Sequence, residues 1–84
     1  MPNYRLYTLK FADNATKQFV DANYCDFYNQ GTTNVYVNGR TIFPGAGFSV
    51  AAYPGEVDQT NYEIVFDTSN LAGNNLLVTI KQYI

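Results

Sequence analysis

Apolar and polar residues alternate in short segments along this chain, and turn-forming residues separate the segments. The clearest example is the pair of segments at residues 34–37 and 40–43, which flank Asn38-Gly39. Asn and Gly both tolerate the positive φ angles of a type I′ turn, so Asn-Gly between two alternating segments is a strong hairpin signal. The sequence therefore predicts a two-residue β-hairpin here.

The register of this hairpin follows from the length of its loop. A two-residue loop places Val35 opposite Ile42, so these two side chains and Val37 share one face. This aliphatic face is the better candidate for the core, and it leaves Tyr36 and Phe43 near the second face.

Similar alternation predicts strands in most of the remaining chain. These strands are expected at residues 5–11, 24–28, 48–53, 61–67 and 76–84, and the last one turns Leu76, Val78 and Ile80 inward and Lys81 outward. A polar turn is expected at residues 12–16 and a loop at 67–75, whereas residues 17–22 fit either a short strand or one helical turn. Strands that recur about every 8 to 12 residues are typical of an all-β sandwich or barrel. We expect a small antiparallel β-sandwich or jelly-roll-like barrel of about six to eight short strands.

The chain has 84 residues, which is the size of one domain spanning residues 1–84. Residues 1–22 form either an ordinary first strand with a polar loop or an extended arm that pairs with a neighbouring molecule. A chain of this length buries only about 60% of its unfolded surface, and small domains often need additional stabilisation. One cysteine cannot form an internal disulfide, so we expect contacts between subunits, and a homo-oligomer, to contribute.

Charge is scarce, with a net charge of −2 and only 14% charged residues. Such a composition argues against nucleic-acid binding and against a polybasic membrane surface. No segment approaches the roughly 20 apolar residues of a membrane span. Residues 1–5 lack the layout of a signal peptide, so synthesis in the cytoplasm is expected.

The residues of common catalytic and metal sites are also scarce. Cys25 and the serines Ser49 and Ser69 have no histidine to activate them, because the chain contains none. Glu56 and Asp58 form either a calcium or acid/base pair or a solvated turn, and the turn is favoured. The segment Gly45-Ala46-Gly47 lacks the Lys-Ser/Thr of a phosphate-binding loop and is better explained as a turn. We expect no enzymatic activity, catalytic residue, cofactor or metal site.

Aromatic residues, in contrast, reach 17%, with eight Tyr and six Phe. Tyr-rich surfaces with few charges suit contacts with proteins or sugars, because a tyrosine combines an apolar ring with a polar tip. The alternative is that some of these rings form a second core face. The candidate interface residues are Tyr4, Tyr7, Tyr36, Phe43, Tyr53 and Tyr83.

Residues 29–39, which end in Val35-Tyr36-Val37-Asn38-Gly39, lead through Phe43-Pro44-Gly45 to residues 55–62, Gly-Glu-Val-Asp-Gln-Thr-Asn-Tyr. This pattern covers about half of the chain and resembles small β-sandwich structural proteins of bacteriophages, which serve as capsid auxiliary, vertex or fibre-base components. The resemblance implies a virion protein that binds other capsid or virion proteins by shape, as a cement, vertex (penton) or fibre-base component. The alternative is a carbohydrate- or receptor-binding β-sandwich module that uses exposed Tyr and Asn side chains.

Overall fold

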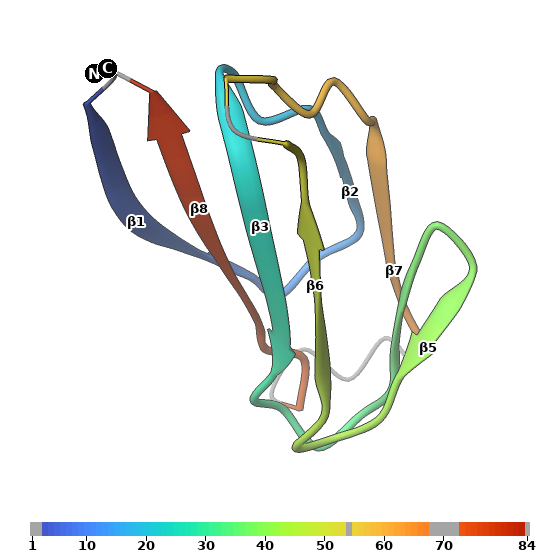
Figure 1. Cartoon of the computed structure of the whole chain (residues 1–84). Helices are drawn as coiled ribbons and strands as arrows, with labels where there is room; N and C mark the ends of the chain where they lie inside the picture. Colours follow the sequence, from blue (N-terminus) through green and yellow to red (C-terminus); the bar gives the residue numbers. More distant parts are fainter. Residues whose placement is uncertain (1–2, 54, 68–72, 84) are drawn as a thin grey trace.

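The computed structural model describes residues 3–53, 55–67 and 73–83, and every regular element within these ranges is a β-strand (Figure 1). The strands are β1 (Tyr4–Phe11), β2 (Ala15–Lys17), β3 (Ala22–Asn29), β4 (Val35–Val37), β5 (Arg40–Ile42), β6 (Gly47–Ala51), β7 (Tyr62–Phe66) and β8 (Leu76–Tyr83). The expected all-β antiparallel fold is confirmed. Among the described residues there is no helix with the length and apolar character needed to cross a membrane.

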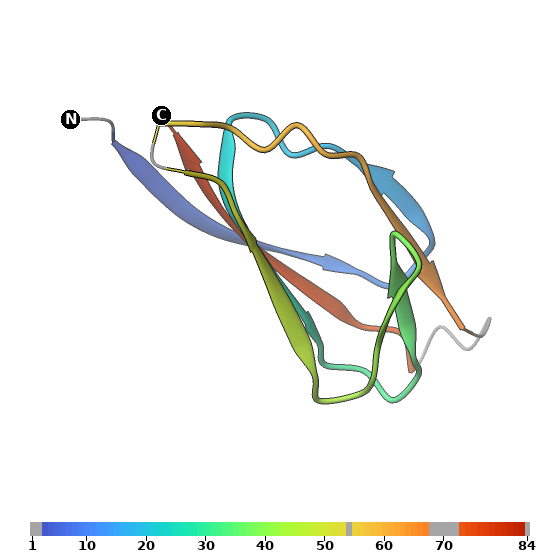
Figure 2. The same ribbon diagram turned by 45° about the vertical axis from the view of Figure 1, so that its right-hand side comes forward.

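The strands form two four-stranded sheets, with the orders β1-β8-β3-β6 and β2-β7-β4-β5. Figure 2 shows the sheets as two facing layers. The pairings are nested, because β4 pairs with β5, β3 with β6, β2 with β7 and β1 with β8, all antiparallel. One long hairpin that is wrapped into two sheets in this way is a jelly roll.

The innermost hairpin of this arrangement is the one that the sequence predicts. Asn38 and Gly39 have φ angles of 51° and 82°, as a type I′ turn requires, and Val35 lies opposite Ile42. Val35, Val37 and Ile42 are all buried, so the choice of core face is confirmed.

The core lies between the two sheets and is built from their inward-facing side chains. Phe27 is fully buried at its centre, and its ring lies 5.0 Å from the rings of both Phe48 and Tyr62. The predicted inward set of β8, Leu76, Val78 and Ile80, is also fully buried. Aromatic contacts therefore connect the two sheets, since Phe27 and Phe48 belong to one sheet and Tyr62 to the other.

Buried asparagines hold the loops at both ends of β3. The Asn29 side-chain amide donates to the carbonyls of Thr33 (2.8 Å) and Ile42 (2.9 Å), and its oxygen accepts from the Gly31 N–H (2.9 Å). At the other end, Asn23 donates to the carbonyls of Tyr53 and Glu56. These bonds satisfy backbone groups of the loops and of the last residue of β5.

The N-terminal segment pairs within its own chain. All of β1 pairs with β8, from Tyr4 opposite Tyr83 to Phe11 opposite Leu76, and β2 pairs with β7. In this structure residues 4–11 and 15–17 are therefore parts of the two sheets.

The expectation for residues 12–22 is wrong in detail. A strand begins at Ala15, inside the predicted turn, and ends at Lys17, and residues 18–21 form neither the expected strand nor a helical turn. Phe19 is buried against Tyr62, and the Gln18 amide donates to the Gln59 carbonyl. Phe19 is buried while its neighbour Val20 is exposed, and this segment shows no sequence period, so tertiary contacts decide its structure. The predicted loop at 67–75 lies partly outside the described residues.

Candidate interaction surface

Tyrosines gather on the outer face of the β1-β8-β3-β6 sheet. Because Cys25 and Phe27 point into the core, their neighbours Tyr24, Asp26 and Tyr28 point outward. The strand registers place Tyr24 opposite Lys81, and Tyr4 opposite Tyr83, on this same side. We call this outer side the tyrosine face; its aromatic members are Tyr4, Tyr24, Tyr28 and Tyr83.

One end of the tyrosine face is an aromatic pair with a cation beside it. The rings of Tyr4 and Tyr83 lie 4.8 Å apart and are tilted by 37°, and the Lys81 ammonium lies 4.1 Å from the centre of the Tyr4 ring. The Gly55 N–H donates to the Tyr83 hydroxyl at 2.8 Å. These contacts hold both rings in place, so little side-chain entropy remains to be lost on binding.

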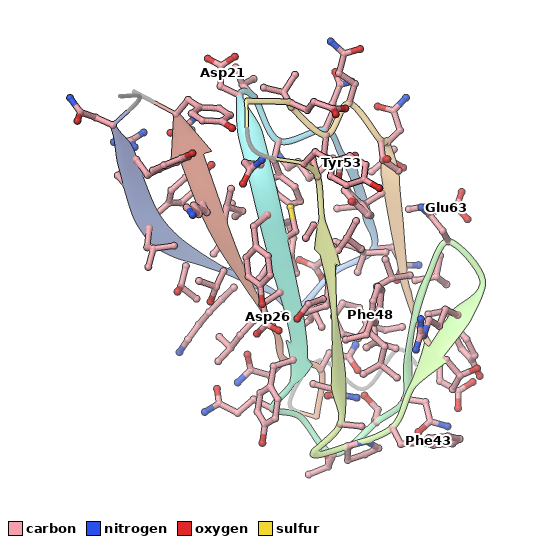
Figure 3. The ribbon with its side chains drawn as sticks, in the orientation of Figure 1. Asp21, Asp26, Phe43, Phe48, Tyr53 and Glu63 are labelled. Atoms are coloured by element: carbon pink, nitrogen blue, oxygen red, sulfur yellow. The ribbon has the colours of Figure 1, made fainter. Side chains whose placement is uncertain are left out.

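A polar row crosses the middle of the face. The register aligns four residues from the four strands, Thr8, Thr79, Asp26 and Ser49. The hydroxyls of Thr8 and Thr79 lie 3.1 Å apart, and Ser49 donates to Asp26 at 2.8 Å. Tyr24 in turn donates to the Ser49 hydroxyl at 2.9 Å. Figure 3 shows Asp26 on β3, near the middle of the sheet.

The next row places Tyr28 beside Gly47 on β6. A Cβ atom at Gly47 would lie 2.3 Å from the Phe27 carbonyl oxygen, so only glycine fits there. Tyr28 is 41% exposed, and Leu6 on β1 is 68% exposed. The tyrosine face therefore offers apolar rings and a leucine around a hydrogen-bonded polar row, a composition typical of protein interfaces.

Of the six predicted interface residues, the structure places the rings of Tyr4 and Tyr83 in direct contact. Tyr7 lies on the inner side of β1, with the Arg5 guanidinium 5.3 Å from its ring centre. Tyr36 lies on the outer side of the other sheet, where its hydroxyl donates to Asp67 at 3.2 Å and the charge of Asp67 raises its pKa.

The remaining two candidates, Phe43 and Tyr53, are exposed at opposite ends of the molecule (Figure 3). Tyr24 and Tyr28 belong to the tyrosine face but were not among the sequence candidates. Their alternation with Cys25 and Phe27 is the signal that could have identified them.

The carboxylate of Asp58 accepts hydrogen bonds from two neighbouring residues of the chain, Thr60 and Tyr62. One carboxylate oxygen accepts from the Thr60 N–H (3.0 Å) and hydroxyl (2.6 Å), and the other accepts from the Tyr62 hydroxyl. Burial acts to raise the pKa of Asp58, but these hydrogen bonds outweigh it and lower the pKa. Glu56 is exposed. In the described ranges, no group of three or more His, Cys, Asp or Glu side chains is placed to hold a metal ion.

The other residues that the sequence offered for catalysis or ligand binding include a buried cysteine and a turn glycine. Cys25 is fully buried, and desolvation, followed by the charge of Asp58, raises the pKa of its thiol to about 12. Such a thiol is a poor nucleophile, because the thiolate is the reactive form. Gly45 lies in a turn with a φ angle of 80°, and its N–H donates to the Asn29 carbonyl. Ser69 lies outside the described residues.

Comparison of the chain with protein-family models, with curated proteins and with solved structures found no match.

Proposed function

We propose that this chain is a structural component of a bacteriophage particle, a minor capsid, decoration or vertex protein that docks on neighbouring virion proteins. The observation that carries the proposal is the tyrosine face, a surface that spans all four strands of one sheet. Contacts through this face, repeated over a particle, would stabilise it without any catalytic step.

The chemistry of the tyrosine face favours binding to protein. Tyrosine buries a large apolar area with few rotatable bonds, and the Tyr4–Tyr83 pair and the Tyr24–Ser49 bond already hold three of these rings. Lys10, Lys81 and Asp26 are the charged side chains on this face, so docking would desolvate few charges.

The fold supports the same proposal by analogy. Jelly rolls form viral capsid domains, and they also form lectin domains, so the fold alone does not establish a function. A rigid sheet presents its side chains at fixed spacing, which suits repeated docking on a symmetric particle. Many copies that attach together remain bound even when each contact is weak. The proposed partners are other capsid or virion proteins and further copies of this chain.

Incorporation of variants into particles tests the role of the tyrosine face. The double variant Tyr24→Ser/Tyr28→Ser removes two exposed or half-exposed rings from this face and leaves the core unchanged. The matched control, Tyr36→Ser/Tyr53→Ser, removes two tyrosines from other surfaces. The proposal expects the first variant to be lost from purified particles and the control to be retained. Equal incorporation of both folded variants would contradict it.

A second function, carbohydrate binding, is favoured by the surroundings of Tyr53, in the loop that follows β6. Tyr53 is 78% exposed and, with Ala51, Ala52 and Glu56, lines an open hollow of about 440 Å³. An exposed ring beside a carboxylate can stack on a sugar and accept hydrogen bonds from its hydroxyls. Glycan-array binding that Tyr53→Ala abolishes and Tyr36→Ala preserves would support this function over the first.

A further inference from the structure

Among the strands of the described residues, β1 has the longest edge that no other strand covers. The sheet order places β1 at one end of its sheet, and in Figure 1 it forms the left-hand border of the ribbon. The other strands at sheet ends are shorter: β6 has five residues and β2 and β5 have three each, whereas β1 has eight. A long open edge is a template for pairing with another strand.

Two hydrogen bonds at the ends of β8 identify the free backbone groups of β1. The Tyr83 N–H donates to the Asp21 carbonyl, and the Asn75 carbonyl accepts from the Gln30 N–H, so both residues face the β3 side. Successive residues of a strand direct these groups alternately to its two sides, so the even-numbered residues of β8 face β1. Their partners in β1 are Arg5, Tyr7, Leu9 and Phe11. The free N–H and C=O groups therefore belong to Tyr4, Leu6, Thr8 and Lys10.

We infer that β1 pairs with β1 of a second copy of this chain, antiparallel and with Tyr7 opposite Tyr7 of that copy. The pairing joins two four-stranded sheets into one sheet across a two-fold axis.

The backbone groups are self-complementary in this register. Tyr4 lies opposite Lys10 of the second copy, and Leu6 lies opposite Thr8. Every residue of β1 with free backbone groups thus meets another such residue, and all of these groups form hydrogen bonds. Shifting the register by two residues would pair Tyr4 with Ala12, which lies beyond the end of β1, and would leave some groups unpaired.

The side chains are also compatible with this pairing. Arg5 and Lys10 project from opposite faces of β1, so a two-fold continuous sheet cannot place the one directly opposite the other. Arg5 instead meets Leu9 of the second copy, and Lys10 meets Tyr4. Leu6 is 68% exposed and Leu9 is 37% exposed in the single chain, and the second strand would cover part of both. These features favour a second copy over an unrelated strand.

The inference is independent of the proposed role in a virion. A chain that pairs through β1 but is absent from particles would contradict only the proposed function. A chain that is present in particles but does not pair through β1 would contradict only this inference.

Disulfide trapping tests the register. Arg5→Cys and Leu9→Cys are made as separate variants, and each alone and their equimolar mixture are oxidised with diamide, which accepts the two hydrogen atoms that the thiols lose. The pairing expects a disulfide-linked dimer in the mixture and little in either variant alone, since residue 5 faces residue 9 of the other copy. The native thiol of Cys25 is buried and does not compete. Failure of the mixture to crosslink above the single variants would overturn the register.

A proline substitution tests whether two copies associate through the open edge of β1. Thr8→Pro removes an N–H that points to the open side and spares the bonds from β1 to β8, whereas Thr8→Ala keeps that N–H and serves as the control. Sedimentation equilibrium should show a wild-type dimer, a similar dimer for Thr8→Ala, and at least tenfold weaker association for Thr8→Pro. A wild-type chain that stays monomeric, or a folded Thr8→Pro variant that associates as strongly as Thr8→Ala, would overturn the inference. If Thr8→Pro does not fold, the trapping experiment decides.

Discussion

Tyr4 packs against Tyr83 with their ring centres 4.8 Å apart, although the two residues lie near opposite ends of the chain. This contact joins the first and last strands of the nested fold and forms one end of the tyrosine face. The same Tyr83 accepts a hydrogen bond from the Gly55 N–H, so it also holds the loop that follows β6. A single side chain thus connects the sheet edge, the loop and the proposed docking surface.

Two substitutions at Tyr83 separate these contacts. Tyr83→Phe keeps the ring and loses the hydroxyl acceptor, and we expect the free energy of unfolding to fall by about 1 kcal/mol. Tyr83→Ala also loses the ring contact with Tyr4 and should lower it by about 1 kcal/mol more. Urea unfolding measures both values. A Tyr83→Phe variant as stable as the wild type would show that the bond to Gly55 contributes nothing.

The buried Asn29 should be among the most sensitive polar positions. Asn29→Ala leaves the carbonyls of Thr33 and Ile42 and the N–H of Gly31 without this partner. Because unsatisfied buried groups are costly, we expect a loss of about 2 to 4 kcal/mol, visible as a lower urea midpoint. The control is Asn3→Ala, at an exposed position, which should change the midpoint little. Similar midpoints for the two variants would rule out this function of Asn29.

Asp58 and Tyr62 should limit stability on the acid and alkaline sides. Folding lowers the pKa of Asp58 below its ordinary 3.8, so its contribution is full above about pH 4 and is lost as pH falls. Folding raises the pKa of Tyr62 above its ordinary 10.0, chiefly by burial and then by the bond to Asp58. The contribution of Tyr62 is therefore present below about pH 10 and is lost as the pH rises further.

Melting temperatures measured from pH 2 to pH 11 test both directions. Asp58→Asn should reduce the loss of stability below pH 4, and Tyr62→Phe should reduce the loss above pH 10. Wild-type and Asp58→Asn curves that stay parallel through the acid range would show that Asp58 titrates as it does in the unfolded chain.

Cys25 should resist modification in the folded chain. It is fully buried, and the pKa of about 12 keeps the thiol protonated at pH 8, so iodoacetamide should label it only on unfolding. A Ser49→Cys variant supplies an exposed thiol as the positive control and should be labelled once in native conditions and twice in urea. Rapid labelling of Cys25 in the native wild type would contradict the buried placement.

The local parts of this fold could be predicted from the sequence. The Asn38-Gly39 turn, its register and the buried face of Val35, Val37 and Ile42 follow from turn chemistry and a period of two. The same two-residue period correctly assigns Leu76, Val78 and Ile80 to the inward side of β8. These features depend on residues close together in the chain, where geometry leaves few alternatives.

The features that depend on distant contacts could not be predicted. The nested pairing of β1 with β8 joins residues near the two ends of the chain, and no local pattern encodes it. The tyrosine face was only partly predicted, because a tyrosine signals neither the sheet nor the side on which it lies. Tyr4 and Tyr83 meet only through the β1–β8 register, whereas Phe43 and Tyr53 lie at opposite ends.

The most direct test of the proposed function is quantitative mass spectrometry of phage particles purified from the lysate of cells that produce this chain. We expect the chain to remain with gradient-purified particles, in a constant ratio to the major capsid protein, and high salt should not remove it. A chain that is abundant in the lysate but absent from the particles would contradict the proposal.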